Sequence, residues 1–168
     1  SVNMGDAIYL SPASWLRKQA QMVKDAGVKP ELECFDTGHV SFAKQMIEEG
    51  LIDGDPMFQF CLGIPWGAEN DPETIEYLKS RIPENAHWSA FSIGKMQLPT
   101  VREVAQRGGN VRVGLEDNIY VRKGVKATNE ALAEEAKRIL AELDIEPLTP
   151  AEAREKFNLR NPHGKGDK

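Results

Sequence analysis

Short extended apolar runs alternate with helix-forming stretches along this sequence, and this alternation constrains the fold more than any other feature. Successive runs begin roughly 25–30 residues apart, which is the length of one strand and one helix with their connections. Strands and helices that alternate in this way favour right-handed crossovers and a parallel sheet. The extended runs lie at 1–5, 31–36, 57–63, 87–94 and 110–116, and the first of these is only partial.

Capping residues mark where several of the helices begin and end. Ser11–Pro12 and Asp71–Pro72 each place an N-cap residue before a proline suited to the first helical position. Thr149–Glu152 has the spacing of a capping box. The stretch 129–143 carries apolar residues on one helical face and predicts a helix that covers a sheet; they are Leu132, Ala136, Ile139, Leu140 and Leu143. Helix-closing glycines are expected at Gly27, Gly50 and Gly108.

Alternation within the strands indicates which kind of parallel sheet to expect. The run 110–116 places its valines opposite Arg112 and Glu116, and the run 31–36 places its leucine and cysteine opposite its two glutamates. A doubly wound sheet has helices on both faces and would show continuous apolar runs. A barrel lumen that carries a site explains the polar face better. We therefore predict an α/β fold of the (β/α)8 TIM-barrel class.

The number of strands indicates that this chain supplies about the last five βα units of such a barrel. A (β/α)8 barrel has eight strands and about 250 residues, so three units are expected to precede Ser1. Residues 1–168 are then the C-terminal portion of a single barrel domain, with 161–168 as a flexible tail. Because such a piece would expose unpaired strand edges, we expect it to be completed by the rest of a longer polypeptide or by another segment.

Charge and composition exclude several classes of function. The 168 residues carry a formal net charge of −5 and the sequence pI is about 5.3, so neither nucleic acid nor an anionic membrane is an expected partner. No apolar run reaches the ~20 residues of a membrane span, and the first residues lack a signal-like pattern. Cys34 and Cys61 lie in apolar runs and are predicted to be buried, reduced thiols. These features favour the cytoplasm.

Several motifs together resemble the β-keto acid cleavage enzymes, whose founding member is the 3-keto-5-aminohexanoate cleavage enzyme of lysine fermentation. The resemblance extends from residue 1 to about 160, and RVGLEDN is its most specific part. It implies a zinc-dependent (β/α)8 barrel that cleaves a β-keto acid with acetyl-CoA to give acetoacetate and a new acyl-CoA. It also implies a homo-oligomer. The motifs are PELECFDTGH, FCLGIPWG, HWSAFSIGKMQLP, GGNVRVGLEDNIYVRKG and TPAEAREKFNL.

The resemblance also implies roles for individual residues. Glu116 matches the zinc ligand of the last strand, and we expect it to face the lumen. Asp117 matches the catalytic base and is expected to point away from Glu116, while Arg112 matches the catalytic arginine. An acid near Glu31 and Glu33 would contact a substrate amino group, and we favour Glu33 because it lies nearer the C-terminal end of its strand. Sequence alone leaves both glutamates open.

The family's other zinc ligands, a His-x-His pair from an early strand, do not occur in this chain. Its three histidines, His39, His87 and His163, are far apart in sequence. This absence agrees with the expectation that earlier barrel units lie outside the chain. His39 follows a strand near the expected rim, and we assign it no role.

Other interpretations remain open at this point. Arg112 could form an ion pair with Glu116 or Asp117 that only stabilises the strand. A class II aldolase-like lyase would also use zinc and a carboxylate, but it would not need acetyl-CoA. A non-catalytic barrel fragment that lacks the His-x-His ligands would bind no metal and show no turnover.

Overall fold

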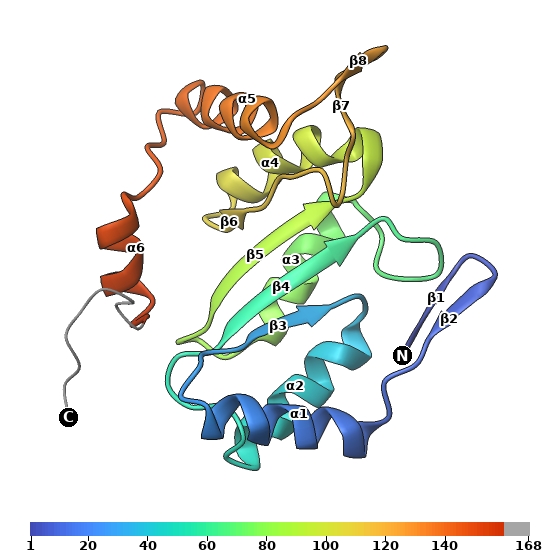
Figure 1. Ribbon diagram of the computed structural model, residues 1–168, viewed down its shortest axis with the longest axis vertical. Coiled ribbons are helices and arrows are strands. Elements are labelled where there is room, and N and C mark those ends of the chain that lie inside the picture. The colour runs from blue at the N-terminus through green and yellow to red at the C-terminus, as the bar shows by residue number, and fades with distance from the viewer. Residues whose placement is uncertain (160–168) are drawn as a thin grey trace.

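The computed structural model describes residues 1–159, and its centre is a four-stranded parallel sheet (Figure 1). The strands are β3 (Glu31–Cys34), β4 (Met57–Leu62), β5 (His87–Ser92) and β6 (Asn110–Val111), in that spatial order. All three pairings are parallel, as the alternation of strands and helices predicts. Within the described residues the four strands form an open sheet. The tail expected at 161–168 lies outside the described residues.

Four helices of the described chain cover one face of this sheet; they are α1 (Ala13–Asp25), α2 (Thr37–Glu48), α3 (Pro72–Arg81) and α4 (Gln97–Gln106). A short 3-10 turn, η1 (Gly94–Met96), precedes α4, while α5 (Asn129–Ala141) packs on α4 and α6 (Pro150–Lys156) follows it. The main core joins residues of α1 to α4 with the side chains of Leu32, Phe58, Phe60 and Trp88. Removal of these large apolar groups from water is the principal force that holds the helices on the sheet.

The capping predictions are confirmed in two of three cases. The Asp71 side chain accepts a hydrogen bond from the Thr74 N–H, and Thr149 with Glu152 forms the complete capping box. The prediction for Ser11 is wrong, because α1 begins after Pro12 and has no side-chain cap. Helix α5 buries four of the five residues predicted for its inner face. The three predicted glycines do end helices, with φ between 64° and 76°.

The partial strand predicted at 1–5 does not join the parallel sheet. Instead β1 (Val2–Met4) pairs antiparallel with β2 (Ala7–Tyr9), and the hairpin extends away from the sheet (Figure 1). Gly5 has φ 62°, a conformation that glycine adopts at little cost and that lets the chain reverse direction after Met4. The parallel sheet of the described residues therefore has four strands rather than five.

The strand predicted at 110–116 is also shorter than expected. Strand β6 ends at Val111, and the backbone N–H groups of Asp117 and Asn118 both donate to the Gly114 carbonyl to form a turn. Leu115 leaves the apolar face and is 39% exposed. A second hairpin, β7 (Tyr120–Arg122) with β8 (Val125–Lys126), follows this turn before α5. The two acids therefore lie on a loop beyond the strand.

Candidate active site

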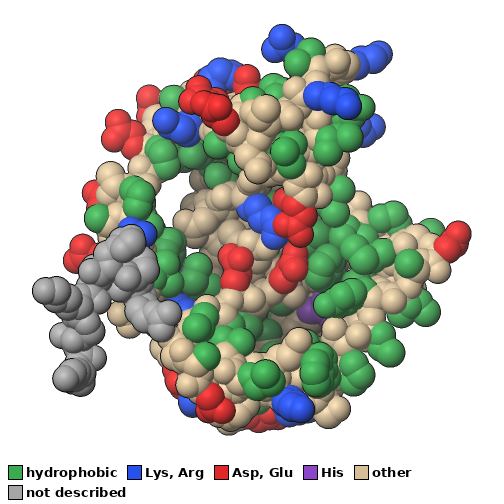
Figure 2. Space-filling view, viewed as in Figure 1, with side chains coloured by type: hydrophobic (Ala, Val, Ile, Leu, Met, Phe, Trp, Pro, Cys, Tyr) green, Lys and Arg blue, Asp and Glu red, His purple; other side chains and the backbone are tan. Residues whose placement is uncertain are grey.

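The candidate site lies on the sheet face opposite the helical core. Side-chain alternation sends Phe58 and Phe60 into the core and leaves Gln59, between them, on the other face. Glu33 occupies the same register position on β3, since it pairs with Gln59. Arg112 follows β6 directly. Figure 2 shows basic and acidic side chains together in the hollow at the centre of this face.

Arg112 is the centre of the cluster. Its Nε and Nη2 donate to the two carboxylate oxygens of Asp117 at 3.0 and 2.9 Å. Nη2 also donates to Glu116 Oε2 at 2.9 Å, and Nη1 donates to Gln59 Oε1 at 2.7 Å. The guanidinium carbon lies 3.9 Å from the centre of the Phe91 ring, so the group is also held from one side by a cation–π contact. The guanidinium is thus fixed by two acids, an amide and a ring.

The two adjacent acids differ strongly in burial. The Asp117 side chain is 4% exposed and the Glu116 side chain is 84% exposed. The prediction that Asp117 points away from Glu116 is wrong, because both carboxylates contact the same guanidinium. The turn after Gly114 explains this, since it breaks the alternation that a continuous strand would impose. The expectation of a lumen-facing Glu116 rested on that same continuous strand.

The loop that carries the acids is held by neighbouring polar groups. Gln97 Nε2 donates to the Gly114 carbonyl at 3.0 Å, and Asn129 Oδ1 accepts the Leu115 N–H at 2.9 Å. The Asp117 carbonyl accepts a 2.6 Å hydrogen bond from the Gly94 N–H. The helices α4 and α5 therefore fix the position of Asp117 through its loop.

Burial and the charges of the cluster together shift two pKa values. Partial burial raises the pKa of Glu33; the positive charge of Arg112, 3.8 Å away, opposes this rise, and the charges of Glu116, Asp117 and Glu31 add to it. Burial by itself would lower the pKa of Arg112, but its hydrogen bond to Asp117 and the surrounding carboxylates raise it above its usual value. The guanidinium therefore stays charged, while Glu33 is the acid of the cluster that accepts a proton more readily than usual.

The two glutamates of β3 have different surroundings. Glu33 approaches Arg112, whereas Glu31 lies 3.5 Å from the Ser89 hydroxyl. Gln59 connects these groups, because its amide donates to the Ser89 oxygen at 3.4 Å while its carbonyl accepts from Arg112. Glu33 is therefore the nearer of the two to Arg112 and the acids.

Sequence reasoning gave no role to Gln59. The sequence did indicate that Gln59 is unusual, because it is the one amide inside the apolar run MFQFCL. Its side chain faces the same way as that of Glu33. The residue is 5% exposed, so its polar atoms need partners within the protein. Arg112 and Ser89 are those partners.

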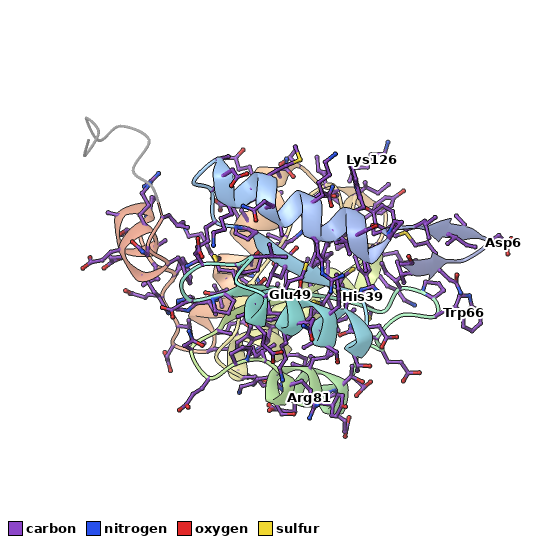
Figure 3. The ribbon with its side chains drawn as sticks, turned by 90° about the horizontal axis from the view of Figure 1, so that it is seen from below. Asp6, His39, Glu49, Trp66, Arg81 and Lys126 are labelled. Atoms are coloured by element: carbon purple, nitrogen blue, oxygen red, sulfur yellow. The ribbon has the colours of Figure 1, made fainter. Side chains whose placement is uncertain are left out.

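His39 and the two cysteines form no hydrogen bond with Arg112 or its acids, although Cys61 packs with Phe91 and lies close enough for the charges of Glu33, Asp117 and Arg112 to influence its pKa. His39 lies on α2 and is labelled in Figure 3. Its Nδ1 accepts a hydrogen bond from the Phe35 N–H, and its Nε2 lies 3.0 Å from the Ser1 carbonyl oxygen. Cys34 and Cys61 are free and buried, as predicted, and burial raises the pKa of each thiol to about 12. His163 lies outside the described residues. Across residues 1–159, no three histidine, cysteine or acidic side chains form a group that could hold a metal ion.

Comparison with known proteins confirms the resemblance. The family model for "beta-keto acid cleavage enzyme" matches residues 1–159. A 3-dehydrocarnitine:acetyl-CoA trimethylamine transferase from Rhizobium meliloti (strain 1021) is 44% identical over 157 residues, which are 94% of this chain and 52% of that protein. A search of the helices in the described part of the chain finds none with the length and apolar character needed to cross a membrane.

Two further relatives have different named substrates. A 3-keto-5-aminohexanoate cleavage enzyme from Fusobacterium nucleatum subsp. nucleatum is 33% identical over 93% of this chain and 57% of its own length. A 3-oxoadipate:acetyl-CoA acetyltransferase from Cupriavidus necator is 32% identical over 95% of this chain and 57% of its own length. The chain thus spans about half the length of the curated relatives that it matches.

Proposed function

The chain belongs to the beta-keto acid cleavage enzyme family, and from this premise we propose that it forms part of a zinc-dependent (β/α)8 barrel enzyme. The reaction transfers an acyl group between a β-keto acid and acetyl-CoA, with acetoacetate and a new acyl-CoA as products. The observation that carries the proposal is the cluster around Arg112, where a buried aspartate and an exposed glutamate share one guanidinium. Two of these relatives are named as acetyl-CoA transferases.

The roles proposed for the two acids follow their surroundings. Asp117 is the general base, because its carboxylate is held in one orientation by the Arg112 fork and keeps lone pairs free to accept a proton from the substrate. Arg112 fixes that orientation and offers a permanent positive charge close to the place where negative charge develops. Gln59 and Phe91 hold the guanidinium against the sheet.

Glu116 is the residue of this chain that would hold the zinc ion. Its carboxylate is 84% exposed, and of its two oxygens Oε2 is the one that bonds to Arg112, so an oxygen is accessible to a metal. When bound, zinc supplies Lewis acidity toward the keto oxygen of the substrate. The described residues fit this role with a single ligand, so the remaining ligands would come from outside residues 1–159.

Glu33 is proposed to select the substrate. The names of two relatives contain an amine, as trimethylamine and as 5-amino, and a carboxylate near the acids is suited to attract a cationic group. Glu33→Gln should therefore weaken turnover of amino-substituted β-keto acids more than turnover of uncharged ones. Equal loss for both kinds of substrate would remove Glu33 from this role.

Parallel substitution of the two acids tests the proposal. In the complete protein Glu116→Gln removes an anionic ligand, so both zinc content and activity should fall. Asp117→Asn retains the size of the side chain but loses its basicity, so zinc should remain while the rate falls by about 10²–10⁴-fold. Metal analysis and turnover with acetyl-CoA are the measurements. Loss of zinc from Asp117→Asn, or its retention in Glu116→Gln, would reverse the assignment.

The same assay separates the alternative functions. A class II aldolase-like lyase would cleave its substrate without acetyl-CoA, whereas the proposed reaction consumes it. A non-catalytic protein would bind no zinc and show no turnover with or without the thioester. Strict dependence of product formation on acetyl-CoA is the result expected here.

A further inference from the structure

The β7–β8 hairpin is a local basic surface in an acidic protein. It carries Arg122, Lys123 and Lys126, and the segment between Asn118 and Thr128 contains no acidic residue, although the whole chain has a net charge of −5. All three side chains are exposed. None of them forms an ion pair with a described acidic residue. Figure 2 shows basic side chains gathered at the end of the molecule where Figure 1 places β7 and β8.

A cleft connects this hairpin to the candidate active site. Its volume is about 710 Å³, and its lining includes Glu116 and Asp117 as well as Arg122 and Lys123. Lys95, from the turn after β5, lies along the same cleft. Apolar side chains line the wall as well; they are Leu98, Pro99, Ile119 and Val121. The lining of one cleft therefore includes Glu116 and Asp117, an apolar wall and the cationic hairpin.

Hydrogen bonds fix the hairpin relative to the acids. The Asn118 side chain accepts the Tyr120 N–H at 3.0 Å and donates to the Tyr120 carbonyl at 2.7 Å. The Ala127 N–H donates to the Ile119 carbonyl at 2.9 Å and closes the base of the hairpin. Asn118 is itself 6% exposed and follows Asp117 directly. The base of the hairpin is thus joined by hydrogen bonds to the loop that carries Asp117.

The distribution of charge selects the kind of ligand. A short β-keto acid at Asp117 would not need cations on a hairpin that extends away from the sheet. A longer ligand that reacts at one end and carries phosphates at the other would fit the whole cleft. Its phosphates would lie at the cations of the hairpin, because cations attract phosphates and the acids repel them, and its reactive end would lie at Asp117. Coenzyme A thioesters have this construction, with an extended arm between the thioester and a phosphorylated nucleotide.

We propose that the cleft binds the coenzyme A part of the thioester, with its phosphates on Arg122 and Lys123 and its arm along the apolar wall toward Asp117. This inference rests on the proposed function for the identity of the thioester. Tyr120, 44% exposed and part of the cleft lining, offers a ring on which the adenine base can stack. Lys95 is a further cation along the path.

A binding experiment tests this site without requiring turnover. Free coenzyme A is titrated by calorimetry into the complete protein and into the double variant Arg122→Gln/Lys123→Gln. Two exposed charge contacts with phosphate should together be worth roughly tenfold in Kd. The control is Arg81→Gln/Lys137→Gln, which removes the same two charges elsewhere; Figure 3 shows Arg81 on the opposite side of the molecule from Lys126. The control should bind like the unsubstituted protein.

Dephospho-coenzyme A identifies the interacting group. If the hairpin contacts phosphates, removal of one phosphate from the ligand should weaken binding to the unsubstituted protein more than binding to the hairpin variant. The difference between the two proteins should also shrink as salt screens the contacts. Equal affinities of the hairpin variant and the control for coenzyme A would overturn the proposal. Binding that depends on the hairpin in a protein without turnover would instead contradict the proposed function and leave this site in place.

Discussion

Arg112 forms a bidentate hydrogen bond with Asp117, in which Nε donates to Oδ2 at 3.0 Å and Nη2 donates to Oδ1 at 2.9 Å. The Asp117 side chain is 4% exposed. Pairs of this geometry fix orientation as well as charge. Glu116 meets the same guanidinium from the solvent side. The pair thus joins the end of β6 to the loop beyond it.

Replacement of the arginine by lysine should show the value of this geometry. Arg112→Lys keeps the positive charge but cannot hold both oxygens of Asp117 and the Gln59 carbonyl together. We expect turnover to fall about 10²-fold, since a misplaced catalytic group commonly costs that much. The matched control is Arg102→Lys on α4, which changes an exposed ion pair with Glu142 at the end of α5 and should alter turnover little. Similar rates for both variants would contradict this.

Gln59 should act as a positioning residue. Gln59→Met keeps the length of the side chain but removes the carbonyl that accepts from Arg112 at 2.7 Å. A hydrogen bond to a charged group is worth about 1.5–3 kcal/mol, so kcat should fall by at least about tenfold. The control is Gln45→Met, on the exposed surface of α2, where no change is expected. If Gln59→Met slows the enzyme only as much as it destabilises the fold, its role is structural.

The raised pKa of Glu33 predicts a stability that depends on pH. The pKa of Glu33 is higher in the folded protein than the ordinary value of 4.5 that applies to the unfolded chain. Ionised Glu33 therefore lowers the free energy of unfolding at pH values above the folded pKa. Glu33→Gln should therefore raise the free energy of unfolding at pH 7, by no more than about 1 kcal/mol at this partly exposed position. The gain should fade as the pH falls below 4.5. Urea unfolding of metal-free protein at both pH values is the measurement, and an equal gain at both would show that charge is not its cause.

Gly109 lies too close to Trp88 to accept a side chain without loss of stability. A Cβ atom at this position would lie 2.5 Å from the Trp88 ring, which is part of the main core. Gly109→Ala should therefore destabilise the protein by about 1–3 kcal/mol, the usual cost of overpacking. Gly38→Ala is the matched control, because nothing lies within 4 Å of its added methyl group. Unfolding by urea compares the two, and equal stabilities would show that Trp88 moves aside freely.

The order of strands and helices was determined by the sequence itself. Apolar alternation and capping residues are local signals, so they identified β3, β4 and β5, the start of α3 and the inner face of α5. Alternation also placed Glu31 and Glu33 on the polar face. The family was likewise identified from short motifs, because each motif consists of residues that are close together in the sequence.

The arrangement of the acids was decided only by tertiary structure. The pattern NVRVGLE predicts one continuous strand. In such a strand Glu116 would face the lumen and Asp117 would point away from it. In the folded protein the chain leaves the sheet after Val111, because Gln97 and Asn129 from α4 and α5 capture the backbone around Gly114. These partners are 14 or more residues away in sequence, and no local pattern reveals them. They bring Asp117 into a buried position beside Arg112, so that both carboxylates contact one guanidinium instead of pointing apart as strand alternation predicts.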